Sequence, residues 1–180
     1  MRILGLEVPD EGLVFLVALA VHVGAGLVCV VSGTTACLAR KRAGAHPWWG
    51  RVYLCGLGVV AVSALVLAVV RWPHDNHLLA VAVVTAGLGG FGWAARRRRR
   101  PGWPVRHAVG LGGSFAGLLI GFYVDNGPQL PLWDRLPHPV YWFLPGVVAA
   151  VLIRRALRRF GVNARLWRAG PPAGWPAPPH

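Results

Sequence analysis

Three histidines, His22, His46 and His107, are the residues whose type and setting could do chemistry. An imidazole can ligate a metal, hold a haem iron as an axial ligand, or exchange a proton near neutral pH. His22 stands about ten residues inside a long apolar run, so at roughly 15 Å of helical rise it approaches the middle of a bilayer. An ionisable side chain at that depth is a functional candidate by default.

The histidines support several interpretations, which the sequence leaves open. His22 could be a neutral structural imidazole that hydrogen-bonds a neighbouring backbone group or serine, or part of a path for protons or ions. Alternatively, His22, His46 and His107 could bind haem b or a quinone. Because two axial imidazoles approach one iron from opposite faces, a haem pair should lie at similar depth on facing helices. This requirement leaves two pairs, His46 with His107 or His22 with His77.

A second candidate site consists of His74, Asp75, His77 and His138, near the opposite surface from His46. Their nitrogen and oxygen atoms suit a divalent transition metal such as zinc. Short loops between membrane helices also concentrate polar residues without binding anything, and this plainer interpretation stands beside the metal hypothesis.

No catalytic motif accompanies these residues in the sequence. There is no recognisable glycine-rich phosphate loop, nucleophile elbow or pair of intramembrane carboxylates. The three cysteines, Cys29, Cys37 and Cys55, form no Cys-x-x-Cys pair and are expected to behave as small apolar residues. The sequence therefore favours a non-enzymatic binding or accessory protein, with no catalytic residue assigned.

Five apolar segments must position these side chains. Of the 180 residues, 55% are hydrophobic and only 14% are charged, too few charges for an ordinary soluble domain. Four segments are long enough to cross a bilayer as helices, and the fifth is long enough if Arg154 and Arg155 snorkel to the headgroups. We expect an all-α membrane domain over residues 1–157 and a basic, proline-rich tail over residues 158–180. The expected spans are residues 12–39, 52–70, 78–95, 107–124 and 140–157.

The loop charges indicate how the chain is threaded. All of the 19 basic residues except Arg2, Arg71 and Arg135 fall on one predicted side, and all six acidic residues fall on the other. The positive-inside rule then places the N-terminus outside and the C-terminus in the cytoplasm, which requires an odd number of spans. The sequence predicts a multi-pass protein of a bacterial inner (plasma) membrane.

Charge and glycine spacing indicate partners. The run Arg96–Arg100 would suggest nucleic acid in a soluble protein, but beside a spanning helix it serves topology and attracts anionic lipids. We therefore expect the lipid bilayer as a partner and no nucleic acid. Gly113, Gly117 and Gly121 recur every four residues and let another helix approach closely, either from the same bundle or from a second copy in a homo-oligomer.

The histidines also fall within a recognisable pattern. His22-Val23-Gly24-Ala25-Gly26, a basic loop, and the spacing His-x-x-x-Gly-Arg-x-Tyr from His46 to Tyr53 resemble a family of small bacterial multi-pass membrane proteins known only as a domain of unknown function. The resemblance covers roughly Val21 to Gly146. It implies a membrane location and recurrent histidines at positions 22, 46 and 107, but no reaction. Pro47 departs from the pattern, because the family usually has arginine there.

Overall fold

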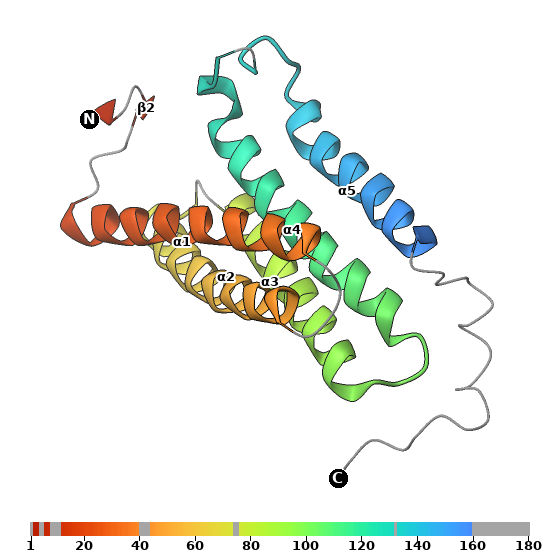
Figure 1. The fold of residues 1–180 in the computed structure, drawn as a ribbon. Helices are drawn as coiled ribbons and strands as arrows, with labels where there is room; N and C mark the ends of the chain where they lie inside the picture. Colours follow the sequence, from red (N-terminus) through yellow and green to blue (C-terminus); the bar gives the residue numbers. More distant parts are fainter. Residues whose placement is uncertain are drawn as a thin grey trace, which may run out of the picture.

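Five long helices make up most of the described chain in the computed structural model (Figure 1). The structure describes residues 2–3, 6–7, 12–39, 44–73, 76–131 and 133–159. The basic, proline-rich tail predicted beyond residue 159 lies outside this part of the chain. The helices are α1 (Leu13–Leu38), α2 (Ala45–Val70), α3 (Asn76–Arg98), α4 (Trp103–Asn126) and α5 (Pro139–Arg159), with a short 3-10 helix, η1 (Gly127–Gln129), after α4.

The helices have the length and composition that the five apolar segments predict. All five, spanning 20 to 27 residues, are long and apolar enough to cross a membrane. The expectation of an all-helical fold is confirmed, apart from one small feature that the sequence did not predict. Near the N-terminus, β1 (Arg2–Ile3) pairs with β2 (Leu6–Glu7) in a two-stranded antiparallel hairpin.

Two helices begin earlier than the apolar runs, and this changes the setting of the histidines. α2 begins at Ala45 rather than residue 52, because Pro47 lies in the first turn, where the missing amide hydrogen has no helical partner to lose. α4 begins at Trp103 rather than residue 107, directly after Gly102 in the left-handed conformation at φ 77°. His46 and His107 therefore lie on rigid helical turns.

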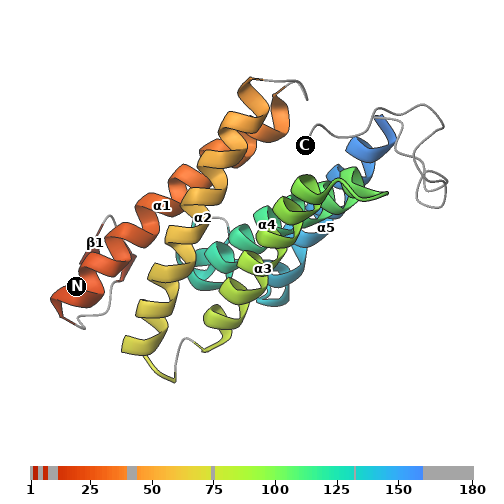
Figure 2. The same ribbon diagram turned by 90° about the horizontal axis from the view of Figure 1, so that it is seen from below.

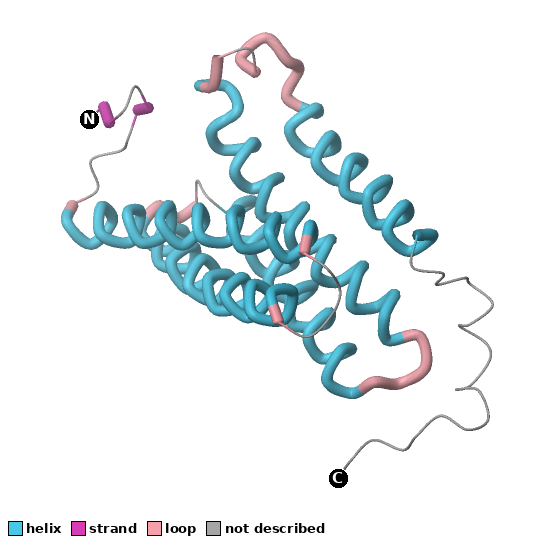
Figure 3. Tube along the Cα trace, in the orientation of Figure 1, coloured by secondary structure: helices cyan, strands magenta, loops and turns pink. Residues whose placement is uncertain are grey.

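The helices pack in chain order as antiparallel neighbours. α1 lies along α2, α3 lies along α4, and α5 packs against the other side of α4. Figures 1 and 2 show the α1–α2 pair crossing the α3–α4 pair at an angle, with contact mainly between α2 and α3. The tube drawing shows the loop that joins α3 to α4 at one end of this pair (Figure 3). The fold is thus two helical hairpins with a fifth helix beside the second.

Glycines bring α3 and α4 into close contact. A Cβ atom added to Gly110 would lie 2.6 Å from the Cα atom of Gly92, so the two backbones touch at this point. Further along the seam, side chains of α3 lie against the glycine face of α4, and a second copy of the chain could reach this face only by displacing α3. The facing residues are Leu88 with Gly113, Thr85 with Gly117, and Val81 with Gly121.

A buried polar contact joins the two hairpins. Cys29, Tyr53 and Leu57 form the buried centre of the bundle, where α1 and α2 meet α4. The hydroxyl oxygens of Tyr53 and Ser114 are 2.6 Å apart, and the Sγ atom of Cys29 is 3.6 Å from the Tyr53 carbonyl oxygen. This cluster fixes α2 against α4 just inside the end of the bundle that carries His46.

Candidate histidine site

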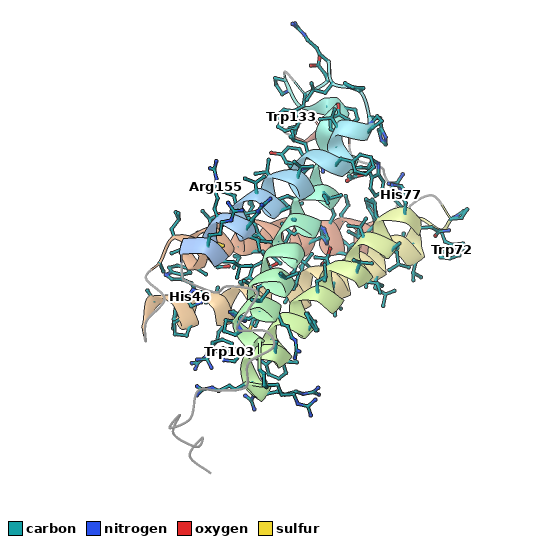
Figure 4. The ribbon with its side chains drawn as sticks, turned by 90° about the vertical axis from the view of Figure 1, so that its right-hand side faces the viewer. His46, Trp72, His77, Trp103, Trp133 and Arg155 are labelled. Atoms are coloured by element: carbon teal, nitrogen blue, oxygen red, sulfur yellow. The ribbon has the colours of Figure 1, made fainter. Side chains whose placement is uncertain are left out.

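The structure brings His46 and His107 together at one end of the bundle. Their ring centres are 6.3 Å apart, and the ring planes are nearly perpendicular, at 81°. His46 comes from the first turn of α2 and His107 from the second turn of α4. Figure 4 shows His46 toward the same end as Trp103, while Trp133 lies at the far end. Of the two pairs that the sequence left open, this is the one the fold assembles.

Backbone carbonyl groups of two further helices orient both rings. The Nδ1 atom of His46 donates to the carbonyl oxygen of Ala36 on α1, at 2.8 Å. The Nδ1 atom of His107 donates to the carbonyl oxygen of Gly92 on α3, at 3.0 Å. Because a carbonyl oxygen can only accept, each neutral ring carries its proton on Nδ1 and its lone pair on Nε2. Four helices therefore determine how this pair of imidazoles is held.

Aromatic and basic side chains surround the pair. The Trp103 ring centre lies 6.3 Å from that of His107, and the Arg96 guanidinium carbon lies 5.0 Å from the centre of the Trp103 ring. Arg97 lies similarly over Trp93, at 5.2 Å. Guanidinium groups stacked on indole rings gain cation–π attraction and hold a defined position. Both histidines are half-buried, so the pair opens onto a positively charged, aromatic rim.

Gly50 is an uncrowded position one helical turn from His46. Gly50 follows His46 by one helical turn and lies on the same face of α2. A Cβ atom added at Gly50 would meet no atom within 4 Å. This contrasts with Gly33, Gly56 and Gly92, where an added Cβ would press on neighbouring atoms. Gly50 therefore has room for a side chain one helical turn from His46, whereas Gly33, Gly56 and Gly92 are closely packed.

His22 lies apart from this pair and is held by α2. Its Nδ1 atom is 3.0 Å from the Oγ atom of Ser63, and it also hydrogen-bonds the backbone of Val60. Ser63 donates its own hydroxyl hydrogen to the carbonyl oxygen of Val59, at 2.8 Å, so the ring nitrogen is the donor in the contact with Ser63. The imidazole is thus hydrogen-bonded to a serine of the neighbouring helix, which is one of the arrangements that the sequence left open.

The second candidate site is only partly within the described chain. His74 and Asp75 lie outside the described residues. His77 packs against Trp142, with ring centres 6.3 Å apart, and His138 packs against Tyr141, at 5.7 Å. Among the described residues, no three histidine, cysteine or acidic side chains form a group able to hold a metal ion. The zinc site at this end stays a prediction.

The sequence interpretation missed two polar links and a groove. Tyr53 stood in the family-like pattern, but nothing in the sequence indicated that its hydroxyl bonds Ser114. The Tyr141 hydroxyl donates to the carbonyl oxygen of Trp133 at 2.6 Å and closes the turn between α4 and α5. An apolar groove of about 260 Å³ also opens between α2 and α3. It is lined by Leu54, Leu57, Gly58, Ala86, Gly90 and Trp93.

Comparisons of the chain with models of known families, with curated proteins and with solved structures found no match. The resemblance to small bacterial multi-pass membrane proteins stays a prediction. Functional conclusions for this chain therefore follow from its own residues and their geometry.

Proposed function

We propose that the chain is an integral protein of a bacterial plasma membrane that binds a ligand or partner protein and does not catalyse a reaction. The five apolar helices support membrane insertion. Large apolar side chains such as Val62, Leu65 and Phe143 are exposed in the isolated chain, where hydrocarbon would cover them. In water, apolar exposure on this scale would drive aggregation.

The orientation that we propose is N-terminus outside and C-terminus in the cytoplasm. The arginines at the connection between α3 and α4, together with Arg51 and Arg106, belong to the end of the bundle that carries His46 and His107. Trp48 and Trp103 lie at this end and suit an interfacial position. The same basic end would attract anionic lipid headgroups, at about 1 kcal/mol per cationic side chain near the surface.

The paired imidazoles of His46 and His107 carry the proposal of a binding function. Each ring comes from a helix and is oriented by a carbonyl group of another helix, so the pair is rigid before any ligand arrives. A rigid, preorganised pair of ring nitrogens loses little conformational entropy on binding. A redox role through haem or quinone is the second candidate function, and the same ring pair favours it.

Reporter fusions test the insertion and its direction. A reporter that is active only in the cytoplasm, fused after Trp167 or after Gly102, should be active, and the same reporter fused after Leu130 should be inactive. A reporter that works only outside the cytoplasm should give the reverse pattern. Activity of the cytoplasmic reporter after Leu130 but not after Gly102 would overturn the orientation, and recovery of the full chain in the soluble fraction would overturn membrane insertion.

Thermal unfolding in detergent tests whether the histidine pair binds anything in the cell. A ligand that stays bound to the folded protein raises its unfolding temperature. Washing wild-type protein with chelator and competing imidazole should therefore lower its unfolding temperature. The same wash should leave the double variant His46→Ala, His107→Ala unchanged. Equal responses of the two proteins would contradict the proposed binding role.

A further inference from the structure

We propose that His46 and His107 are the two axial ligands of a single b-type haem iron at the basic end of the bundle. The inference rests on the proposed binding function and names its ligand. It starts from the separation of the rings. With metal–nitrogen bonds of about 2 Å, and each nitrogen about 1.1 Å from its own ring centre, imidazoles on opposite sides of one metal have centres about 6 Å apart. The observed separation is 6.3 Å.

The hydrogen bonds of the two rings are those expected of metal ligands. A coordinating histidine almost always donates its other ring N–H to a carboxylate, a backbone carbonyl or water, which fixes the tautomer and the ring orientation. His46 and His107 both donate from Nδ1 to backbone carbonyl oxygens, of Ala36 and Gly92. Nε2 is therefore the coordinating nitrogen on both rings.

The donor set favours haem over a lone metal ion. A tetrahedral zinc site takes three or four protein ligands. Within the described part of the chain, no third histidine, cysteine or acidic side chain joins His46 and His107 in a metal-binding group. A haem iron brings four porphyrin nitrogens of its own and requires only two axial ligands from the protein.

The surroundings match the shape and charge of haem. The macrocycle is flat and apolar, and Gly50, one helical turn from His46 on the same face of α2, has room for a Cβ atom among the described residues. The indole of Trp103 lies next to His107 and offers an aromatic surface. Haem also carries two propionate groups, which need cationic partners at the membrane surface. Arg96, stacked on Trp103, and Arg106, adjacent to His107 in the sequence, provide that charge.

Optical spectroscopy of the full-length protein tests the inference. Protein purified in mild detergent from haem-replete cells, or titrated with hemin, should show a Soret band and a low-spin spectrum. The band should be lost or shifted to a high-spin form in His46→Ala and in His107→Ala, and adding imidazole should restore the low-spin form. The control variants His22→Ala and His77→Ala should keep the wild-type spectrum. A folded wild-type protein that takes up no hemin, or a spectrum unchanged in both ligand variants, would overturn the haem assignment.

Two further measurements separate haem ligation from a structural role of the histidines. Gly50→Leu adds a side chain one helical turn from His46, on the same face of α2, and should weaken hemin binding at least tenfold. The matched control, Gly58→Leu, adds the same side chain two turns away, also into open space, and should bind hemin as the wild type does. Equal binding by both variants contradicts the proposed position of the haem.

The ring planes give a spectroscopic signature. Near-perpendicular axial imidazoles, here at 81°, give ferric low-spin haem a strongly anisotropic EPR signal, whereas parallel rings give a three-line rhombic signal. A rhombic signal would overturn the proposed geometry, and tight binding of Zn²⁺ in place of hemin would overturn the choice of haem. If the protein fails these tests while the reporter fusions retain the expected pattern, the haem assignment fails and the proposed membrane topology stands.

Discussion

The hydroxyl groups of Tyr53 and Ser114 meet 2.6 Å apart in the centre of the bundle, linking α2 to α4. Tyr53 is 3% exposed and Ser114 is fully buried. In a membrane, apolar burial gives helices no drive to associate, so close packing and hydrogen bonds between helices hold a bundle together. The bond adds to the packing of α2 against α3 and of α1 against α4, and it therefore helps to fix the angle between the two hairpins.

Tyr53→Phe should lower the free energy of unfolding by about 1 kcal/mol, because it leaves the buried Ser114 hydroxyl without this partner. Unfolding by a denaturing detergent in mixed micelles measures the change. The control is Ser114→Ala, alone and combined with Tyr53→Phe. If the two hydroxyls are coupled, the double variant should lose less stability than the two single losses added together. Strict additivity would contradict the coupling.

Gly110→Ala should destabilise the protein by about 1–3 kcal/mol, the usual cost of overpacking a filled interior. The new methyl group would lie 2.6 Å from the Gly92 backbone, so α3 and α4 would have to separate. Gly90→Ala is the matched control, because a Cβ atom at Gly90 meets nothing within 4 Å. Detergent unfolding compares the two variants, and equal stability would argue against the backbone contact between α3 and α4.

Ser63→Ala should cost about 0.6 kcal/mol and at most about 1.7 kcal/mol, the average and the maximum measured for hydrogen bonds between membrane helices. The variant removes the oxygen that accepts from His22 and leaves the ring with its contact to the Val60 backbone. Thr35→Ala is the control, because the Thr35 hydroxyl donates to the carbonyl oxygen of Val31 in its own helix. A Ser63 variant as stable as the Thr35 variant would show that this bond contributes nothing to the association of α1 and α2.

Thr85→Val should raise stability by up to about 1 kcal/mol. The Thr85 Oγ1 atom is buried in the α3–α4 seam, and no hydrogen-bond partner for it lies in the described part of the chain. Replacing a buried, unsatisfied hydroxyl by a methyl group of similar size removes a desolvation cost. The midpoint of thermal unfolding should rise relative to wild type, and a fall would indicate that the hydroxyl has a partner or that the seam cannot accept the methyl group.

The lengths of the apolar segments and the charges between them were sufficient to predict the five helices, because a bilayer, for which such segments are suited, allows few alternatives to long apolar helices. The helix starts were less predictable. An apolar run marks only the part of a membrane helix that lies in the hydrocarbon core. Residues 45–51 include a histidine, a proline and an arginine, a composition that is also typical of a loop. The backbone hydrogen bonds of a helix do not require apolar side chains, so the helix extends over these residues and begins at Ala45.

The histidine pair was predictable only as one of two alternatives. Depth along each helix placed His46 and His107 near the same surface, but depth does not determine which faces of α2 and α4 meet. The faces that meet are determined by packing at Tyr53 and by the glycine contacts between α3 and α4. The sequence pattern does not show how these residues are arranged in space. The carbonyl partners Ala36 and Gly92 were not predictable at all, because any helical residue offers the same backbone group.

The backbone contact between Gly92 and Gly110 also has a consequence for the membrane setting proposed above. Two helices that touch along glycines occupy a smaller cross-section than two helices separated by leucines. Five consecutive arginines, Arg96–Arg100, occupy the last turn of α3 and the start of its connection to α4, so a high density of positive charge lies over a narrow footprint. In a mixed bilayer, such a footprint would enrich anionic lipids in the annulus of this hairpin, and the composition of the membrane would then tune how firmly α3 and α4 are anchored.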